Sequence, residues 1–316
     1  MDEIERIERR LKLHDVRVLM SVAHAGSMGK AAELLRTSQS AISRSIANME
    51  HALGVRLLDR SKEGIEPTQY GRAIIKRGVA VFDELRQGIK DVEFLADPTS
   101  GELRLACAES MAAGLAFATI ERLNRRYPHA AFHVVAGGGP PLLTELENRN
   151  VEFTISRMTT ELASPHFVTQ MLFDDSYVIV AGSESPWTRR RRIELAELLN
   201  ENWILPPPDN FGAMLIAEAF RARGLSPPRA AIVTLSLNLR NRFLATGRFL
   251  TMLPGYSVRF PDGGPALRAL PVKLPDARAP VCVVTLRNRT LSPLGQRFIE
   301  TLRATVQSMK APRANR

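Results

Sequence analysis

Hydrophobic residues recur at helical spacing in three consecutive segments between residues 11 and 53. The first, 11–23, carries an amphipathic stripe that can pack beneath the two that follow. The second begins at Ser27, a residue type typical of helix N-caps, and contains an alanine pair that lets two helices approach closely. After a polar break at 36–38, the third segment carries Ala41, Ile42, Ile46, Met49 and Leu53 at helical spacing.

The polar face of the third segment has short side chains suited to DNA contact. Opposite its apolar stripe lie Gln39, Ser40, Ser43, Arg44 and Asn48, and such groups hydrogen-bond to base edges and phosphates. Two helices at a sharp turn with this pattern predict a helix-turn-helix. The spacing alone fits a helical hairpin with a solvated polar face equally well.

A short hairpin is expected next. Gly54 is a natural residue to end a helix, residues 55–60 have a strand-like pattern, and a turn follows at 61–64. A hairpin that directly follows a helix-turn-helix is called a wing. It would bring Arg60 and Lys62 towards the DNA backbone or the minor groove.

From Gly71 to Ala96 the pattern predicts one long helix with a heptad seam. The seam consists of Ile75, Phe82, Leu85, Ile89, Val92 and Ala96. It includes Gly78, which admits close helix contact. Such a stripe can be buried within its own domain or against the same helix of a second subunit, and we favour the second subunit. Residues 97–101 form a helix-breaking hinge.

Strands and helices alternate from residue 102 onwards, which predicts an open α/β sheet. In such folds ligands bind beyond the carboxyl ends of strands, where helix N-termini offer free N–H groups. Ser110 follows the first expected strand, and Asn210 holds the same position later, with Phe211 beside it as an apolar wall. Ser236 precedes another helix. Helix capping is the alternative role of each, and it is compatible with ligand contact.

The basic excess lies outside the helix-turn-helix. The whole chain of 316 residues has a net charge of +10, of which residues 1–66 contribute +1 and residues 102–316 contribute +9. Either the C-terminal region attracts anionic small molecules or the charge only aids solubility. We interpret the basic run Arg189–Arg192 as a solvent-exposed segment that leads into a helix rather than as a nucleic-acid-binding patch.

Several classes of protein are disfavoured by what the sequence lacks. No apolar run approaches the length of a membrane helix, and the charged start MDEIERIERR is no signal peptide, so we expect a cytoplasmic protein. Cys107 and Cys282 sit in apolar strand-like runs and are expected to be buried thiols without a redox role. We find no metal-ligand spacing, cofactor motif or catalytic nucleophile, and therefore expect no metal, no cofactor and no enzyme.

The N-terminal segment resembles the winged helix-turn-helix of LysR-type transcriptional regulators. The marks are the alanine pair, SQSAISRSIANME, LGVRLLDR, and PTQYG after the wing, all at fixed offsets. Two departures are mild: Ser40 stands where the family often has proline, and Leu58-Asp59 replaces its commoner Phe-Glu. Ser40 adds a hydroxyl near the groove. The resemblance assigns DNA contacts to Ser27, Ser38, Gln39, Ser40, Ser43, Arg44, Arg60 and Lys62.

Over the whole chain the resemblance implies a fold class of α/β type. A winged helix-turn-helix, a long linker helix and a two-lobed α/β effector domain like the periplasmic binding proteins follow one another. The expected bounds are 1–68 for the DNA-binding domain, 69–97 for the dimerisation helix, 98–101 for the hinge, 102–163 with 268–310 for lobe I, and 164–267 for lobe II.

The resemblance also places an effector between the lobes. It carries contacts over to Ser110, Asn210 and Phe211, and it sets Gly139 where some relatives have a threonine facing the ligand. Arg157 ends the third strand and should point between the lobes. It can pair with an effector carboxylate or with an acid on a crossing strand, and we favour the structural pair.

The sequence therefore indicates a DNA-binding regulator controlled by a small-molecule effector, for which the basic effector region favours an anion. The partners expected are a pseudo-palindromic double-stranded DNA site and further copies of the chain, as a homodimer that assembles to a homotetramer. A two-lobed solute-binding protein without a transcriptional role is the alternative.

Overall fold

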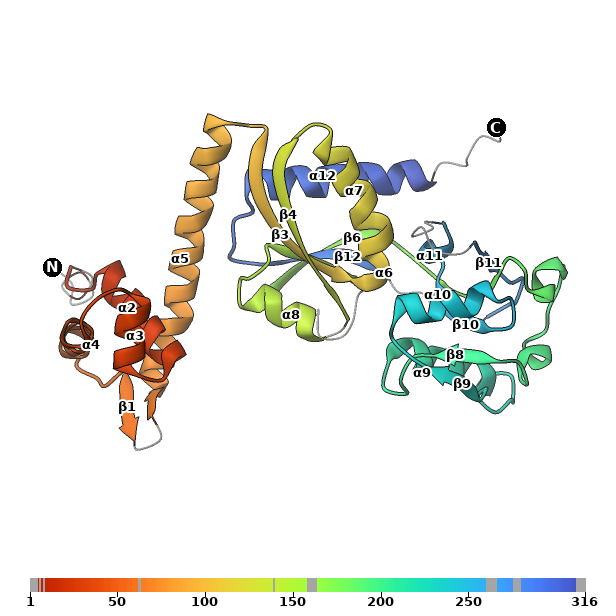
Figure 1. Cartoon of the computed structure of the whole chain (residues 1–316), viewed down its shortest axis with the longest axis horizontal. Helices are drawn as coiled ribbons and strands as arrows, with labels where there is room; N and C mark the ends of the chain where they lie inside the picture. Colours follow the sequence, from red (N-terminus) through yellow and green to blue (C-terminus); the bar gives the residue numbers. More distant parts are fainter. Residues whose placement is uncertain are drawn as a thin grey trace. The chain divides into compact units, whose positions relative to one another are not determined.

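The computed structural model describes residues 5, 7, 9–61, 64–138, 140–157, 164–259, 266–274 and 280–310. The chain forms two compact units, Met1–Ile89 and Lys90–Arg316. The division falls within the long helix α5 (Gln69–Ala96), so this helix contributes to both units (Figure 1). Among the described residues, no helix is long and apolar enough to cross a membrane.

Three short helices form the core of the first unit. They are α2 (Leu13–Ala25), α3 (Met28–Leu34) and α4 (Gln39–Leu53) (Figure 1). Helices α2 and α4 each end at a glycine in the left-handed conformation, Gly26 and Gly54, where a residue without Cβ avoids strain. Their buried contacts come from Val18, Leu19, Val22, Ala31, Ile42, Ile46 and Met49.

The wing is a two-stranded antiparallel hairpin of β1 (Leu58–Ser61) and β2 (Gly64–Pro67). It starts three residues later than the expected strand at 55. At its start, the N–H groups of Leu57 and Leu58 donate to the Glu50 carboxylate (2.7 and 3.3 Å). The hairpin is held against the helices by a hydrogen bond from the Ile65 N–H to the Gly26 carbonyl.

The first half of α5 packs against α2 of its own unit. A Cβ on Gly78 would lie 2.6 Å from Val16 Cγ1, and the Arg17 guanidinium lies 4.7 Å from the centre of the Phe82 ring. The predicted seam is therefore wrong at its N-terminal end, since Ile75 and Phe82 pack within their own domain. The exposed apolar side chains further along α5 are Val81, Leu85, Ile89, Val92 and Leu95.

The second unit contains two five-stranded sheets, each covered by helices. The first sheet, with its helices, is lobe I, and its strand order is β4-β3-β5-β12-β6. Its strands are β3 (Ser100–Ala108), β4 (His129–Gly137), β5 (Phe153–Arg157), β6 (Phe167–Phe173) and β12 (Val281–Leu286). Its helices are α6 (Glu109–Met111), a π-helical turn (Ala112–Ala116), α7 (Phe117–Asn124), α8 (Pro140–Glu147) and α12 (Pro293–Lys310).

The second sheet, with its helices, is lobe II, and its strand order is β11-β7-β10-β8-β9. Its strands are β7 (Tyr177–Gly182), β8 (Trp203–Leu205), β9 (Ala230–Val233), β10 (Leu250–Pro254) and β11 (Leu267–Ala269). Its helices are η3 (Pro186–Arg189), η4 (Leu195–Leu198), α9 (Phe211–Arg221), α10 (Leu237–Ala245) and α11 (Tyr256–Arg259).

The pairing of two strands moves the expected lobe boundaries. Strand β6 pairs with β12 and belongs to the sheet of lobe I, although residues 164–267 were expected to form lobe II. Strand β11 pairs with β7 and extends the sheet of lobe II as far as Ala269. Strands β6 and β11 each lie near a point where the chain passes from one lobe to the other. There the strand with which each one pairs, and not its place in the sequence, decides which sheet it belongs to.

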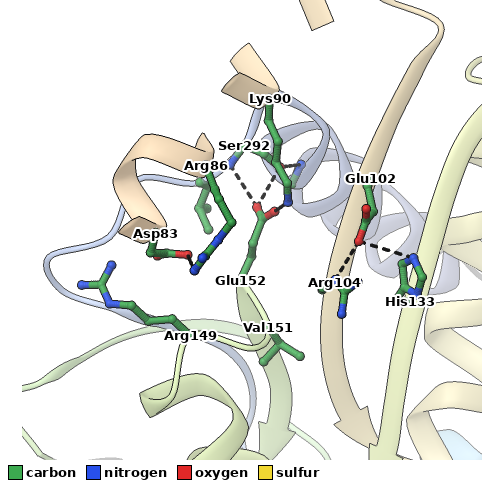
Figure 2. Close-up of polar contacts among 12 residues, drawn as sticks. Asp83, Arg86, Lys90, Glu102, Arg104, His133, Arg149, Val151, Glu152 and Ser292 are labelled. Atoms are coloured by element: carbon green, nitrogen blue, oxygen red, sulfur yellow. Dashed lines mark hydrogen bonds and ion pairs between the residues drawn. The ribbon is translucent and has the colours of Figure 1, made fainter. Parts of the chain in front are cut away.

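A buried carboxylate ties the end of α5 to lobe I (Figure 2). The Glu152 side chain is 1% exposed, and Lys90 Nζ lies 2.8 Å from its Oε1. Ser292, just before α12, donates its N–H (3.0 Å) and its hydroxyl (2.7 Å) to Oε2. A Cβ on Gly295 would lie 2.7 Å from the same oxygen, so the space for the carboxylate depends on that glycine. Three donors satisfy this buried charge.

Candidate functional site

The exposed face of α4 carries the side chains expected to read DNA. Gln39, Ser40 and Arg44 are exposed, and Ser43 is half-buried. Ser38 caps the helix, because its Oγ accepts the Ala41 N–H at 3.2 Å and lies 3.0 Å from Ser40 Oγ. The N-terminal turn of α4 is thus a cluster of small polar groups, which suits phosphate or base contact.

The opposite face of α4 fixes its position. Ile42, Ile46 and Met49 are buried, and the hydroxyl of Ser45 donates to Asp15 Oδ1 on α2 at 2.5 Å. Sequence reasoning missed Ser45, since a serine in a polar-looking helix gives no sign that it faces the core. These buried contacts hold the exposed face of α4 in a defined orientation.

Two expected positions differ in detail. Ala41 was placed on the apolar stripe but is exposed, because it lies one residue before the buried Ile42 and so turns towards solvent. Ser27 occupies the N-cap of α3 with extended backbone, yet its side chain makes no capping hydrogen bond.

On the wing, Arg60 Nη2 lies 3.8 Å from Met28 Sδ. Lys62 lies outside the described residues.

In the second unit, side chains from both lobes meet in an interlobe cluster. We define it as Ser110, Arg157, Asp175, Tyr177 and Tyr256. Arg157 Nη2 donates to Asp175 Oδ2 at 3.2 Å, and the Arg157 guanidinium lies 4.7 Å from the Tyr177 ring centre and 5.6 Å from that of Tyr256. Arg157 thus pairs with the acid that follows β6, as favoured from its position at the end of β5.

Tyr256 joins the two lobes through both its side chain and its backbone. Its hydroxyl donates to Ser110 Oγ at 2.5 Å, and its N–H donates to Asp175 Oδ1 at 3.1 Å. Burial raises the pKa of both Tyr256 and Tyr177. Both phenols are therefore neutral at physiological pH and keep a proton to donate.

The remaining expected contacts lie at helix N-termini of lobe II. Asn210 Oδ1 accepts the Gly212 N–H at 2.9 Å and caps α9, and Ser236 Oγ accepts the Leu239 N–H at 3.3 Å and caps α10. Phe211 is 45% exposed, and its ring centre lies 6.0 Å from that of Tyr177.

The structure therefore brings Ser110, Arg157 and Phe211 together through the two tyrosines, and no described contact joins Ser236 to them. Gly139 lies outside the described residues. Sequence reasoning missed Asp175, Tyr177 and Tyr256. The sequence indicates them only as polar or aromatic residues near the ends of strands, where the chain passes from one lobe to the other.

The two cysteines are buried and unpaired. Cys107 belongs to the core on one face of the lobe I sheet and Cys282 to the core on the other. Burial raises the pKa of Cys107 to about 12 and also raises that of Cys282. Among the described residues no group of three or more histidine, cysteine, aspartate or glutamate side chains could hold a metal ion.

Comparison with known families defines the class. Residues 13–72 match the model of the bacterial regulatory helix-turn-helix proteins of the lysR family, and residues 96–307 match that of the LysR substrate binding domain. The chain belongs to this family. It is a LysR-type transcriptional regulator with a DNA-binding helix-turn-helix and an effector-binding domain. A solute-binding protein without a transcriptional role does not account for the match at 13–72.

Individual relatives are distant but span the chain. It is 24% identical to the HTH-type transcriptional regulator GbpR of Azospirillum brasilense, over 94% of this chain and 87% of that protein. It is 23% identical to the hydrogen peroxide-inducible genes activator of Pectobacterium carotovorum subsp. carotovorum, over 94% and 97%. A full-length OxyR variant from Pseudomonas aeruginosa has the same fold, with a TM-score of 0.62 at 20% identity over 94% of this chain and 95% of that one.

Proposed function

We propose that α4 reads a double-stranded DNA operator in the major groove through Gln39, Ser40, Ser43 and Arg44. The observation that carries this proposal is the contrast between the two faces of α4. One presents exposed polar groups beside a capped N-terminus, and the other is locked by buried apolar contacts and by Ser45. Ser27, Ser38, Arg60 and Lys62 would contact the backbone around this helix. The regulator acts in the cytoplasm, where bacterial DNA lies, and has no catalytic role.

The regulator binds DNA as a dimer joined through α5. The apolar side chains that remain exposed on this helix, from Val81 to Leu95, lie three or four residues apart, which is the spacing of a helix-pairing seam. Two heads then grip a pseudo-palindromic site, and the near-neutral charge of each head makes this pairing important for affinity.

The effector domains associate further to form a homotetramer. Each lobe has a helix and an edge strand on which large apolar side chains are exposed. In lobe I these are Phe117 on α7 and Val134 and Val135 on β4. In lobe II they are Met214 on α9 and Val233 on β9, beside a cavity of about 490 Å³ lined largely by apolar residues. Faces of this kind favour association between copies.

A small-molecule effector binds at the interlobe cluster and controls DNA binding. Ser110 offers its hydroxyl proton, because its Oγ accepts the Tyr256 hydroxyl. Phe211 offers an exposed ring, and Asn210 lies beside it. The charge of Arg157 is already balanced by Asp175, but its Nη1 is buried without a hydrogen-bond partner among the described residues. That N–H group favours an effector with an acceptor oxygen, such as a carboxylate. Binding that changes the closure of the lobes shifts the balance between DNA-bound states.

The decisive experiment is a gel shift with the full chain and the DNA upstream of its own gene. We expect a shift at lower protein concentration than with random DNA of equal length, and a change in the shift when the correct metabolite is added. Equal binding to both DNAs would contradict sequence-specific recognition. A screen of carboxylates against neutral sugars and amines by thermal shift tests the effector class, and stabilisation by the neutral compounds or amines alone would contradict it.

A further inference from the structure

The carboxylate of Glu50, in the last turn of α4, binds the backbone that enters the wing. Its Oε1 accepts the Leu57 N–H at 2.7 Å and the Leu58 N–H at 3.3 Å. Leu57 is fully buried, so its N–H needs a partner within the protein, and Leu58 is the first residue of β1. One side chain of α4 therefore holds the first strand of the wing through that strand's backbone.

Glu50 lies where a carboxylate is locally unfavourable. The C-terminal end of a helix carries partial negative charge, so an acidic side chain in the last turn opposes the helix dipole. Helix α4 ends at Leu53, and Glu50 is half-buried in its last turn. The two backbone donors compensate for this position, because hydrogen bonds to a charged acceptor are stronger than those between neutral groups. Its contact with the wing thus explains why an acid stands at this place.

The wing depends on the helices for its orientation. It has two strands of four residues each, and an isolated hairpin of this size is marginally stable. Asp59 on β1 stands opposite Glu66 on β2, both exposed, and like charges directly opposite one another weaken a hairpin. Anchors on the helices must therefore hold it. The Ile65 N–H, which donates to the Gly26 carbonyl at 3.0 Å, anchors β2, and Glu50 anchors β1.

The anchor on β1 is close to the cation expected to contact DNA. Arg60 lies two residues beyond Leu58 on the same strand, and because side chains alternate along a strand it lies on the same face. It is exposed, and its Nη2 lies 3.8 Å from Met28 Sδ at the start of α3. A change in the direction of β1 at its first residue would move Arg60 relative to the exposed face of α4.

We infer that Glu50 is a positioning residue, which fixes Arg60 relative to the DNA-reading face of α4 so that both contact the same duplex. The inference rests on the proposed contact of Arg60 with DNA. Glu50 acts through the backbone of Leu57 and Leu58 and not by contact with the DNA. Electrostatics alone predicts the opposite effect, since removal of an acidic side chain from a DNA-binding head should strengthen its binding to a polyanion.

Titration of the full chain with the upstream DNA and with random DNA of equal length tests the inference. Glu50→Ala, which removes the acceptor, should weaken binding to both about tenfold. Glu50→Gln removes the same charge but keeps an acceptor oxygen, and should bind within about threefold of the unaltered protein. His51→Ala is the matched control, because His51 is exposed in the same turn of α4, and it should leave binding unchanged.

A double-mutant cycle with Arg60→Ala separates positioning from general stability. Arg60→Ala alone should weaken binding about tenfold and reduce the salt dependence by about one phosphate contact. Adding Glu50→Ala to that variant should weaken binding no further, whereas a merely structural role would lower affinity by the same factor in both backgrounds. Circular dichroism establishes that each variant is folded at the temperature of the titration. If Glu50→Ala does not fold, Glu50→Asp, which keeps the charge on a shorter side chain, takes its place in the cycle.

Three outcomes would overturn the positioning role while DNA binding by the head still stands. They are undiminished binding by the Glu50→Ala or Glu50→Asp protein, a loss in Glu50→Gln as large as in Glu50→Ala, and equal losses with and without Arg60. An Arg60→Ala protein that binds both DNAs normally would overturn the proposed wing contact and the positioning role together. Equal binding of the unaltered protein to both DNAs would overturn sequence-specific recognition alone, because the cycle can still be measured on the random DNA.

Discussion

The Cα of Gly71 faces the Leu57 carbonyl so closely that an added Cβ would lie 2.1 Å from its oxygen. This contact is where the start of α5 meets the chain entering the wing. Thr68 supports the same junction, since its Oγ1 donates to the Arg56 carbonyl and accepts the Gly71 N–H. This close approach explains why the last residue of PTQYG is a glycine. Any side chain at this position would have to displace the backbone of Leu57.

Replacement of Gly71 by alanine should destabilise the first unit by about 3 kcal/mol, because a backbone oxygen cannot move aside as a flexible side chain can. The measurement is urea unfolding of the full chain, followed by circular dichroism. Gly88 is the matched control on the same helix, since nothing lies within 4 Å of an added Cβ there. Gly88→Ala should be neutral or stabilising by up to about 1 kcal/mol. Equal effects of the two substitutions would contradict the steric explanation.

Arg44→Ala should weaken specific DNA binding by roughly 1–3 kcal/mol if Arg44 contacts a base. Its side chain is exposed on α4, so the protein should remain folded. The measurement is a titration with the upstream DNA and with random DNA of equal length. An equal loss on both would reassign Arg44 to a phosphate contact.

Replacement of Glu152 should disturb lobe I more than replacement of Lys90. Glu152→Ala strands two buried donors on Ser292 and should cost about 3–5 kcal/mol. Lys90→Ala leaves the carboxylate with those two donors and should cost less. The exposed pair Glu102–Arg104, also drawn in Figure 2, is the control, and its loss should cost under about 1 kcal/mol. Thermal unfolding ranks the three variants, and a larger loss for Lys90→Ala would refute this account.

The exposed stripe on α5 predicts that Leu85→Glu and Val92→Glu together convert the homotetramer to dimers that are joined only through their effector domains. Two charges per helix in the seam remove the apolar contact and repel each other across it. Light scattering after gel filtration measures the mass. The control is Glu84→Lys, an exposed change outside the stripe. Retention of the tetramer in the double variant would place this interface elsewhere.

Neither cysteine should respond to peroxide, because both thiols are buried. A thiol with a pKa of about 12, such as Cys107, is almost wholly protonated at any pH well below that value, so the reactive thiolate is scarce at pH 7–8. Iodoacetamide should label both residues in urea and neither in the native protein at pH 8. Native labelling would show that a thiol is accessible, and so would a peroxide-induced change in DNA binding that is lost in Cys107→Ser.

The helix-turn-helix could be predicted from the sequence because its determinants are local. Caps, the apolar spacing of α4 and the glycines at 26, 54 and 71 lie within one short segment. The interlobe cluster could not. Tyr256 reaches Ser110 across 146 positions, and Arg157 meets Asp175 only because β6 returns to lobe I. The prediction that the apolar stripe of α5 pairs with a second subunit was wrong for the first half of the helix. Periodicity shows that a stripe is apolar but not which partner covers it.

Strand β12, at Val281–Leu286, lies between β5 and β6 in the lobe I sheet. A ribosome must therefore translate past Leu286 before that sheet can close, whereas every residue of the winged helix-turn-helix has emerged much earlier. The DNA-reading head can fold while its control domain still has two unpaired strand edges. Truncation before residue 281 would leave a head that binds DNA without regulation, attached to a domain prone to aggregate.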